Sequence, residues 1–280
     1  MDIGTTLERT IEPVDVAYLL DVDGVVSDPF KKRVTEPKFF SAFAAALLRG
    51  DVVALNTGRS ISWLLERIIE PLRGRVLHDG ALAHFSAFGE KGAAWVWFDH
   101  RGTMHRGKDD DLSLAGAVRD QVRGLVKARY ADWMFFDETK ETMISVEIRD
   151  GCDPQVFSSM QHRLEEDLSA LFRTAIQAGD LRIDGTTIAT DVQHGSAGKA
   201  LGARRFIDLL TGQRLRPSRF VAFGDSDSDL DMADELHRQG RRVEFVYVSP
   251  TVLAHEFHRP YAIKHEESGR GALRHLDPHP

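Results

Sequence analysis

The chain has 280 residues, of which 42% are hydrophobic and 28% charged, enough to bury a core in one large or two smaller domains. Its formal net charge of −7 does not favour nucleic acid or an anionic membrane as a partner. The single cysteine, Cys152, excludes an internal disulfide framework. The first stretch, MDIGTTLERTIEPVD, lacks the apolar segment of a signal peptide, and no apolar run has the length of a membrane span. We therefore expect a soluble, cytoplasmic protein.

Short apolar runs alternate with helical patterns over the first 80 residues. Val16–Leu20 and Asp51–Asn56 are predicted to be buried strands, with Arg75–Leu77 as a short third strand. Apolar residues spaced three and four positions apart between 61 and 68 predict a helix, which we expect to end at Pro71. Strands and helices in this order indicate a parallel sheet with helical crossovers.

The segment from 81 to 193 shows a different pattern. Ala94–Phe98 and Met143–Ile148 alternate as half-exposed strands do, and further strands are predicted at 181–183 and 187–190. Helical stripes cover 114–125 and 156–168. These elements predict an α+β domain, inserted over residues 81–193, with a sheet of its own. The stretches GEKGAA and HRGKDDD are interpreted as ordinary solvated loops.

The first pattern returns near residue 198. It predicts a helix through 203–210, a strand at Arg219–Phe223, a helix through 232–236, and strands at Val243–Val248 and Tyr261–Lys264. The fold expected is therefore α/β, with a doubly wound parallel sheet built from residues 1–80 and 194–280 and interrupted by the inserted domain.

Three polar clusters follow predicted strands of this sheet. DVDGVVSD follows the first strand, NTGRS the second, and GDSDSDLDMA the strand at Arg219–Phe223. Ligands of open α/β sheets bind at the carboxyl ends of the strands, so the clusters should bring Asp21, Asp23, Asp225 and Asp229 together. Four carboxylates in one crevice repel one another unless a cation binds them, and hard oxygen ligands favour Mg²⁺.

A place for a phosphate is predicted beside these acids. Thr57 and Gly58 are expected to open a helix, where backbone N–H groups and a hydroxyl can hold an anion. Lys199 is expected to open another helix and supplies a compact positive charge. Carboxylates, a divalent cation, an anion cradle and a lysine together suit phosphoryl transfer.

DVDGV, TGR, a helix-opening lysine and GDSDSD, in this order, resemble the four motifs of the haloacid dehalogenase (HAD) superfamily. The inserted domain resembles the type IIB cap of Cof-like sugar phosphatases, so the resemblance covers nearly the whole chain. It implies a Rossmann-like HAD core in which Asp21 is the nucleophile and forms an aspartyl-phosphate. Asp23 would protonate the leaving alcohol and later activate water.

The resemblance also implies two sets of ligands. Mg²⁺ would be held by Asp21, the backbone carbonyl of Asp23, and Asp225, with Asp229 nearby. The phosphate would be held by Thr57, the amide of Gly58, and Lys199. Three positions depart from the family's pattern: Val25 replaces a common threonine, Ser228 replaces an asparagine usual in Cof-like members, and Ala200 follows the lysine where glycine is more frequent.

The function favoured by these residues is Mg²⁺-dependent hydrolysis of a small phosphate monoester, such as a sugar or polyol phosphate, with that metabolite as the partner. A sugar phosphomutase would use the same aspartyl-phosphate. A non-catalytic binding or regulatory protein could keep the fold, although intact Asp21 and Asp23 argue against it. The sequence identifies neither the substrate nor the oligomeric state.

Several residues keep two interpretations. Arg59 would either serve the phosphate or form a salt bridge. Cap residues would either contact the substrate or lie on solvated faces; they are Lys140, Arg149, Arg182 and His194.

Overall fold

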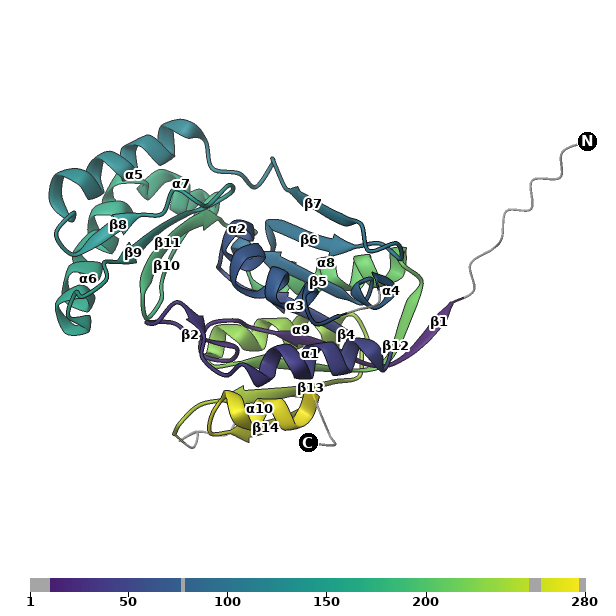
Figure 1. The fold of residues 1–280 in the computed structure, drawn as a ribbon. Helices are drawn as coiled ribbons and strands as arrows, with labels where there is room; N and C mark the ends of the chain where they lie inside the picture. Colours follow the sequence, from purple (N-terminus) through teal and green to yellow (C-terminus); the bar gives the residue numbers. More distant parts are fainter. Residues whose placement is uncertain (1–10, 77–78, 252–257, 277–280) are drawn as a thin grey trace, which may run out of the picture.

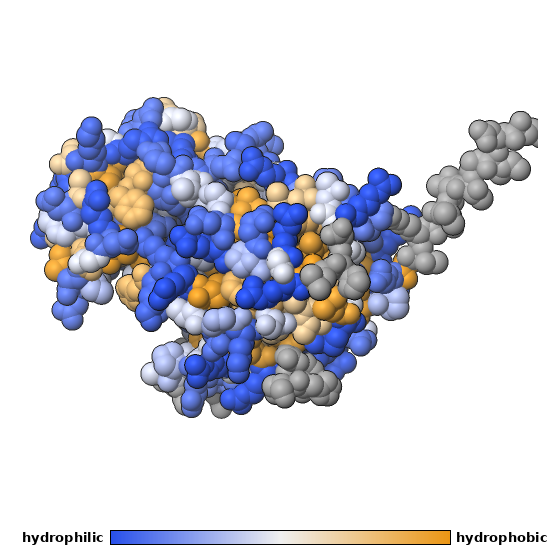
Figure 2. All heavy atoms as spheres, viewed as in Figure 1, coloured by the Kyte–Doolittle hydropathy of each residue, from blue (hydrophilic) through white to orange (hydrophobic). Residues whose placement is uncertain are grey.

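The computed structural model of the chain describes residues 11–76, 79–251 and 258–276. Figure 1 shows a larger α/β core and a smaller α+β domain at one end of it. Hydrophilic side chains cover most of both parts on the face shown in Figure 2, with apolar patches between them. Among the described residues, no helix is long and apolar enough to cross a membrane.

Eight strands form the core sheet, and the last two in spatial order run antiparallel to their neighbours. The strands are β1 (Glu12–Leu20), β4 (Val52–Asn56), β5 (Phe85–Gly89), β6 (Ala94–Phe98), β7 (Met104–Lys108), β12 (Leu215–Gly224), β13 (Val243–Val248) and β14 (Ala262–Glu266). Their spatial order is β14–β13–β12–β1–β4–β5–β6–β7, and β14 to β5 are parallel. A short hairpin of β2 (Ser27–Asp28) and β3 (Arg33–Val34) follows β1.

Helices cover both faces of this sheet, which explains why the carboxyl halves of the central strands β1 and β12 are apolar and buried. One face packs against α1 (Lys38–Leu48), α4 (Asp79–Leu82), α10 (Gly269–Leu276) and the helical run 61–73. The other face packs against α8 (Lys199–Gly212) and α9 (Leu230–Arg238). Alternation along β1 serves both layers, because Tyr18 and Leu20 join the first core and Ala17 and Leu19 the second.

The expected end of a helix at Pro71 is wrong. The run consists of α2 (Ile61–Leu64), a π-helical turn (Leu65–Ile69) and α3 (Glu70–Arg73), and it stops only at Gly74. Pro71 lies in the first turn of α3, a position where proline is tolerated.

The third strand is also elsewhere. Arg75 and Val76 are not in a strand, and Leu77 lies outside the described residues. The third parallel strand is β5, whose five residues are all buried.

The predicted boundary of the inserted domain at residue 81 is wrong as well. Strands β5, β6 and β7 extend the core sheet as far as Lys108. Strand β6, which was expected in the separate sheet, alternates in burial at this antiparallel end. Ala94, Val96 and Phe98 join one core, whereas the other face is only partly covered and leaves Trp95 and Trp97 half-exposed.

The inserted domain, called the cap from here on, follows β7 and has its own sheet and core. Its four strands lie in the order β10–β11–β9–β8 and are antiparallel. The strands are β8 (Met134–Phe136), β9 (Ile144–Ile148), β10 (Leu181–Gly185) and β11 (Ala189–His194). Its helices are α5 (Gly116–Arg129), α6 (Pro154–Leu171) and α7 (Arg173–Ala178).

Candidate active site

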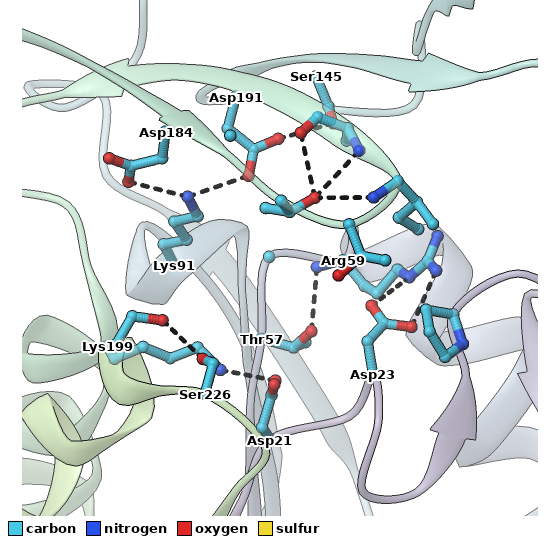
Figure 3. A pocket seen from close by; sticks show the side chains of 18 of the residues that line it. Asp21, Asp23, Thr57, Arg59, Lys91, Ser145, Asp184, Asp191, Lys199 and Ser226 are labelled. Carbon is cyan, nitrogen blue, oxygen red and sulfur yellow. Dashed lines mark hydrogen bonds and ion pairs between the residues drawn. The ribbon is translucent and has the colours of Figure 1, made fainter. Parts of the chain in front are cut away.

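A cavity of about 770 Å³ lies between the cap sheet and the carboxyl edge of the core sheet. Residues that follow β1, β4 and β12 form its core side, and residues of β9, β10 and β11 form its cap side (Figure 3). The three polar clusters predicted to meet at this edge therefore do meet.

Three carboxylates form a compact group in this cavity. Oxygen atoms of Asp21, Asp225 and Asp229 all lie within 4.8 Å of one another. Asp21 directly follows β1, and its N–H donates to the Phe223 carbonyl of the neighbouring β12 at 2.9 Å. Asp21 and Asp229 are buried, whereas Asp225 is exposed to the cavity. The end of the central strand thus fixes the first carboxylate among the others.

Asp229 is fixed by the turn that precedes α9. Its Oδ2 accepts hydrogen bonds from the N–H groups of Asp225 and Ser226, both at 3.1 Å, and from the Ser226 hydroxyl at 2.8 Å. This capping box occupies Oδ2 and turns Oδ1 toward the cavity's lysine.

Lys199 is that lysine, and it begins α8 as predicted. Its Nζ lies 2.6 Å from Oδ1 of both Asp21 and Asp229 and donates to the Asn56 carbonyl at 2.9 Å. The Asn56 side chain donates back to the Lys199 carbonyl at 2.8 Å, which ties the start of α8 to the end of β4. A Cβ at Gly202 would lie 2.1 Å from Asn56 Oδ1, so glycine permits this close approach.

The charges in this group do not balance. Burial raises the pKa of Asp21 well above its usual range; Lys199 opposes the shift and Asp229 adds to it. Burial, followed by repulsion from Asp229, raises the pKa of Asp225 to about 7. For Lys199, burial lowers the pKa, but Asp21 and Asp229 outweigh it and the net shift is upward. One lysine among three acids leaves negative charge that a proton or a cation must neutralise.

The residues fit Mg²⁺. Three hard oxygen donors converge from two strands, and one of them, Asp225, is open to the cavity. Gly24 has a φ of 77°, and a Cβ there would lie 1.9 Å from Asp225 Oδ2, so only glycine brings the backbone after Asp23 so close. The role of the Asp23 carbonyl as a fourth ligand stays a prediction.

The side chain of Asp23 is not part of the carboxylate group, contrary to the expectation that all four acids converge. Arg59 donates to both of its oxygens, from Nε at 2.8 Å and from Nη2 at 2.9 Å (Figure 3). The Ser27 hydroxyl also donates to Asp23 at 3.0 Å. Arg59 is buried and also lies 3.5 Å from Glu147 of the cap. Of its two interpretations, the salt bridge is the one that the structure shows.

Thr57 and Gly58 lie in the loop after β4 and not in a helix, because the N-cap is Ser60 and α2 starts at Ile61. The Thr57 hydroxyl accepts from the Arg59 N–H at 3.2 Å. The N–H of Gly58 has no partner among the described residues, and Gly58 lines the cavity. An open N–H in the cavity that Lys199 also lines suits an anion, so the phosphate site at this loop stays a prediction, although the expected helix start is absent.

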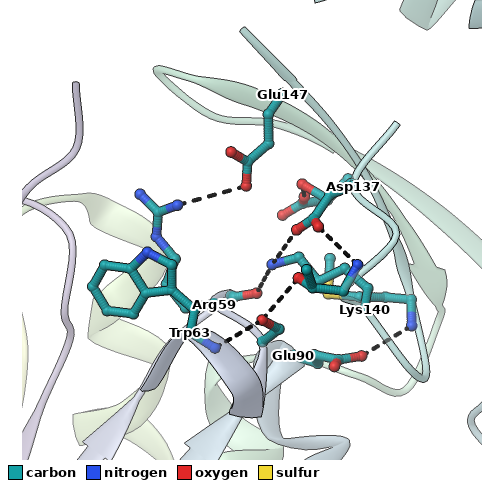
Figure 4. A network of polar contacts seen from close by, with 12 residues as sticks. Arg59, Trp63, Glu90, Asp137, Lys140 and Glu147 are labelled. Atoms are coloured by element: carbon teal, nitrogen blue, oxygen red, sulfur yellow. Dashed lines mark hydrogen bonds and ion pairs between the residues drawn. The ribbon is translucent and has the colours of Figure 1, made fainter. Parts of the chain in front are cut away.

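Sequence reasoning missed Glu90 and Lys91, which lie in the stretch GEKGAA that the sequence predicts to be a solvated loop. Both are buried, and both adopt left-handed φ angles of 51° and 55°. The Glu90 carboxylate accepts from the N–H groups of Glu141 and Thr142 and from the Thr142 hydroxyl, at 2.7 to 3.0 Å (Figure 4). No local signal distinguishes such a pair from a solvated one, since the partners are about 50 residues away.

Lys91 also contacts the cap, through β10 and β11 and not through residues 141–142. Its Nζ lies 3.1 Å from Asp184 and 3.0 Å from Asp191, which come from β10 and β11. Its backbone N–H donates to the Thr57 carbonyl at 2.9 Å. The dipeptide therefore joins the cap to the loop after β4.

Of the cap residues with two interpretations, Lys140 and Arg182 line the cavity and Arg149 and His194 do not. Lys140 is buried and donates to the Gly58 carbonyl at 2.7 Å (Figure 4). Arg182 pairs with Asp184 at 3.0 Å.

The α/β core, the cap over its carboxyl edge and the acid group between them define the capped HAD fold, which the sequence had implied. No protein-family model and no curated protein matches the sequence. Solved structures do match.

The C-terminal domain of trehalose-6-phosphate phosphatase from C. albicans has a TM-score of 0.67 and 14% identity, covering 94% of this chain and 91% of that one. The Aspergillus fumigatus trehalose-6-phosphate phosphatase gives 0.53 and 15%, covering 94% and 92%. A truncated Plasmodium falciparum IMP-nucleotidase gives 0.56 and 12%, covering 95% and 72%. At these identities the likeness establishes the fold.

Proposed function

We propose that this chain is a Mg²⁺-dependent phosphatase that hydrolyses a small phosphate monoester through an aspartyl-phosphate on Asp21. The observation that carries the proposal is the acid group of Asp21, Asp225 and Asp229, with one lysine, at the floor of a capped cavity. The fold shared with phosphatases such as trehalose-6-phosphate phosphatase supports it.

The surroundings of Asp21 leave one oxygen for the reaction. Lys199 at 2.6 Å and the Val22 N–H at 2.7 Å both contact Oδ1, and no described residue makes a hydrogen bond or ion pair with Oδ2. In the first step Oδ2 attacks phosphorus, the bond from phosphorus to the alcohol oxygen breaks, and Asp23 gives its proton to that oxygen. Lys199 and the Gly58 N–H stabilise the phosphoryl oxygens.

The second step reverses the role of Asp23. Water attacks the phosphorus of the aspartyl-phosphate and passes a proton to Asp23, and phosphate leaves with Asp21 restored as a carboxylate. The two hydrogen bonds from Arg59 hold the Asp23 carboxylate in place at the wall of the cavity for both steps. When bound, Mg²⁺ would offset the negative charge of the carboxylates and of the phosphoryl group.

The cavity favours a small substrate. Its volume of about 770 Å³ lies in the range of metabolite sites, and the cap covers it. Its cap wall carries hydroxyls and paired charges, including Ser145, Thr186 and Thr187, which suit the hydroxyl groups of a sugar or polyol. We therefore place sugar and polyol phosphates first among the substrates to test.

The test is phosphate release from a panel of phosphorylated metabolites with Mg²⁺, comparing the wild type with Asp21→Asn. We expect release by the wild type and a loss of at least about a thousandfold in the variant, because the amide is not a nucleophile. Equal release by both proteins, or release by neither from any substrate, would show the proposal to be wrong.

A further inference from the structure

A second hollow, of about 760 Å³, lies at the opposite edge of the core sheet and takes no part in the proposed reaction. It is bounded by residues of β1, β12 and β14, by the start of β13, and by the ends of α1 and α10, remote from the cap in Figure 1. Tyr18 in its floor is three residues before Asp21, about 10 Å along the strand. We call it the amino-edge hollow.

The frame of the hollow is built from satisfied groups. Arg49 donates to Asp51 at 3.0 Å and to the Leu276 carbonyl at 2.7 Å, and Asp51 also accepts from the Val16 N–H at 3.3 Å. The buried Tyr18 hydroxyl donates to the His275 carbonyl at 2.9 Å. Two of the acidic side chains in the hollow therefore have a cationic partner already: Asp51 pairs with Arg49, and Glu244 pairs with Lys264 at 3.0 Å.

Three arginines remain once these pairs are set aside. Arg219, Arg242 and Arg274 line the hollow from β12, the start of β13 and α10, and none has an ion pair or side-chain hydrogen bond with a described residue. Arg219 is near enough to the floor to act on Tyr18, whose pKa is raised by burial and then by Asp51 and lowered by Arg219 and Arg49. Asp15 is the remaining acid in the wall.

We propose that the amino-edge hollow binds a small anion with two or more phosphoryl groups, such as a nucleoside diphosphate or triphosphate or an inorganic polyphosphate. Unpaired guanidinium groups repel one another, and an anion between them removes that cost. Each guanidinium presents a fork of donors that matches phosphate oxygens, and arginines from three elements can hold adjacent phosphoryl groups.

The shape and the charge of the hollow favour a small ligand. The protein as a whole carries a net charge of −7, so a long polyanion or an anionic membrane is repelled outside the hollow. The arginines surround a concave space and do not form a flat or convex face. The site is independent of the proposed phosphatase activity, because none of its residues lines the catalytic cavity.

The experiment is calorimetric titration of the full chain with inorganic tripolyphosphate at low ionic strength, without Mg²⁺. The double variant Arg219→Ala/Arg242→Ala should lose at least about tenfold in affinity, because each arginine contributes a charge-assisted contact. Arg106→Ala/Arg173→Ala is the matched control, since it removes two exposed arginines on other elements that also lack partners among the described residues. Thermal unfolding checks that all variants are folded, and Arg274→Gln serves as an independent second variant.

Four outcomes would overturn the proposal. The first two are equal affinity for tripolyphosphate in the wild type and the double variant, and an equal loss of affinity in the control. The third is binding that disappears in Lys199→Ala, which would place the anion in the catalytic cavity. The fourth is binding to anionic lipid vesicles that depends on Arg219 and Arg242 while tripolyphosphate does not bind. Loss in the double variant and in Arg274→Gln, with retention in the control and in Lys199→Ala, is the supporting result.

Discussion

Buried charges occur in two neighbouring regions of this molecule, the acid group in the cavity and the contacts between the core and the cap. The charged groups of the core–cap contacts have partners within the protein, whereas the acid group has more negative charge than its one lysine can neutralise. In the acid group, Asp21, Asp225 and Asp229 share one lysine, and the pKa of Asp225 is raised to about 7, first by burial and then by Asp229. In the core–cap contacts, Glu90 accepts from four donor groups of residues 141–143, and Lys91 lies between two acids.

The same difference appears in single carboxylates. Burial alone would raise the pKa of Asp184, but Lys91 and Arg182 outweigh it and the pKa falls below its usual value. A carboxylate with satisfied partners needs nothing more, whereas a group with surplus charge is complete only with a ligand. The amino-edge hollow shows the opposite surplus, with unpaired arginines, and the same argument predicts an anion there.

The sharpest test of this comparison replaces the lysine in each region. Lys199→Met leaves buried acids without their cation and should lower the free energy of unfolding of the metal-free protein by about 3–5 kcal/mol. Mg²⁺ should restore much of this loss, because it binds the same carboxylates. Urea unfolding with EDTA and with Mg²⁺ measures both quantities.

Lys91→Met is the matched control for that experiment. Its partners, Asp184 and Asp191, are outside the acid group, so its destabilisation should be the same with and without Mg²⁺. If Mg²⁺ rescues both variants equally, or neither, the distinction between the two regions is wrong.

A smaller effect is expected from Glu90→Gln. An amide keeps the shape but loses the charge that strengthens the bonds from Glu141 and Thr142, which should cost about 1–3 kcal/mol. Because the loss is local to the core–cap contact, hydrogen exchange should accelerate at residues 141–143 more than in β1 or β12. The exposed Glu141→Gln is the control, and similar exchange in both variants would contradict a role for Glu90 in holding the cap.

The sequence predicted the site where local patterns determine position. Asp21 ends an apolar run, and a buried parallel strand must deliver its next residue to the carboxyl edge. Lys199 was located from apolar residues four and seven positions later, and the helix does begin there.

The failures arise where distant contacts decide. Glu90 and Lys91 look solvated because their partners lie in the cap, and β6 looks like a separate strand because the sheet continues beyond its parallel part. Asp23 was expected to join the other acids, but Arg59, 36 residues away in the chain, holds its carboxylate apart.

The smallest effect predicted concerns pH. The pKa of Asp225 in the metal-free fold is about 7, well above the value of 3.8 for a solvated carboxyl, so the folded state binds more protons than the unfolded state between these values. The metal-free protein should therefore gain stability as pH falls from 8 to about 5.5. Mg²⁺ competes with that proton, so the rise in Tm produced by Mg²⁺ should be larger at pH 8 than at pH 5.5.

Asp225→Asn separates this effect from general acid sensitivity. The amide carries no charge to titrate, so the variant should lose the share of the pH dependence that Asp225 contributes, leaving that of Asp21, and a large part of the Mg²⁺-induced rise in Tm. Asp208→Asn, a change of the same kind at an exposed aspartate of α8 that does not line the cavity, should keep both. If the Mg²⁺-induced rise in Tm of the wild type does not depend on pH, the surplus negative charge around Asp225 is already neutralised within the protein. The acid group would then need a ligand no more than the core–cap contacts do.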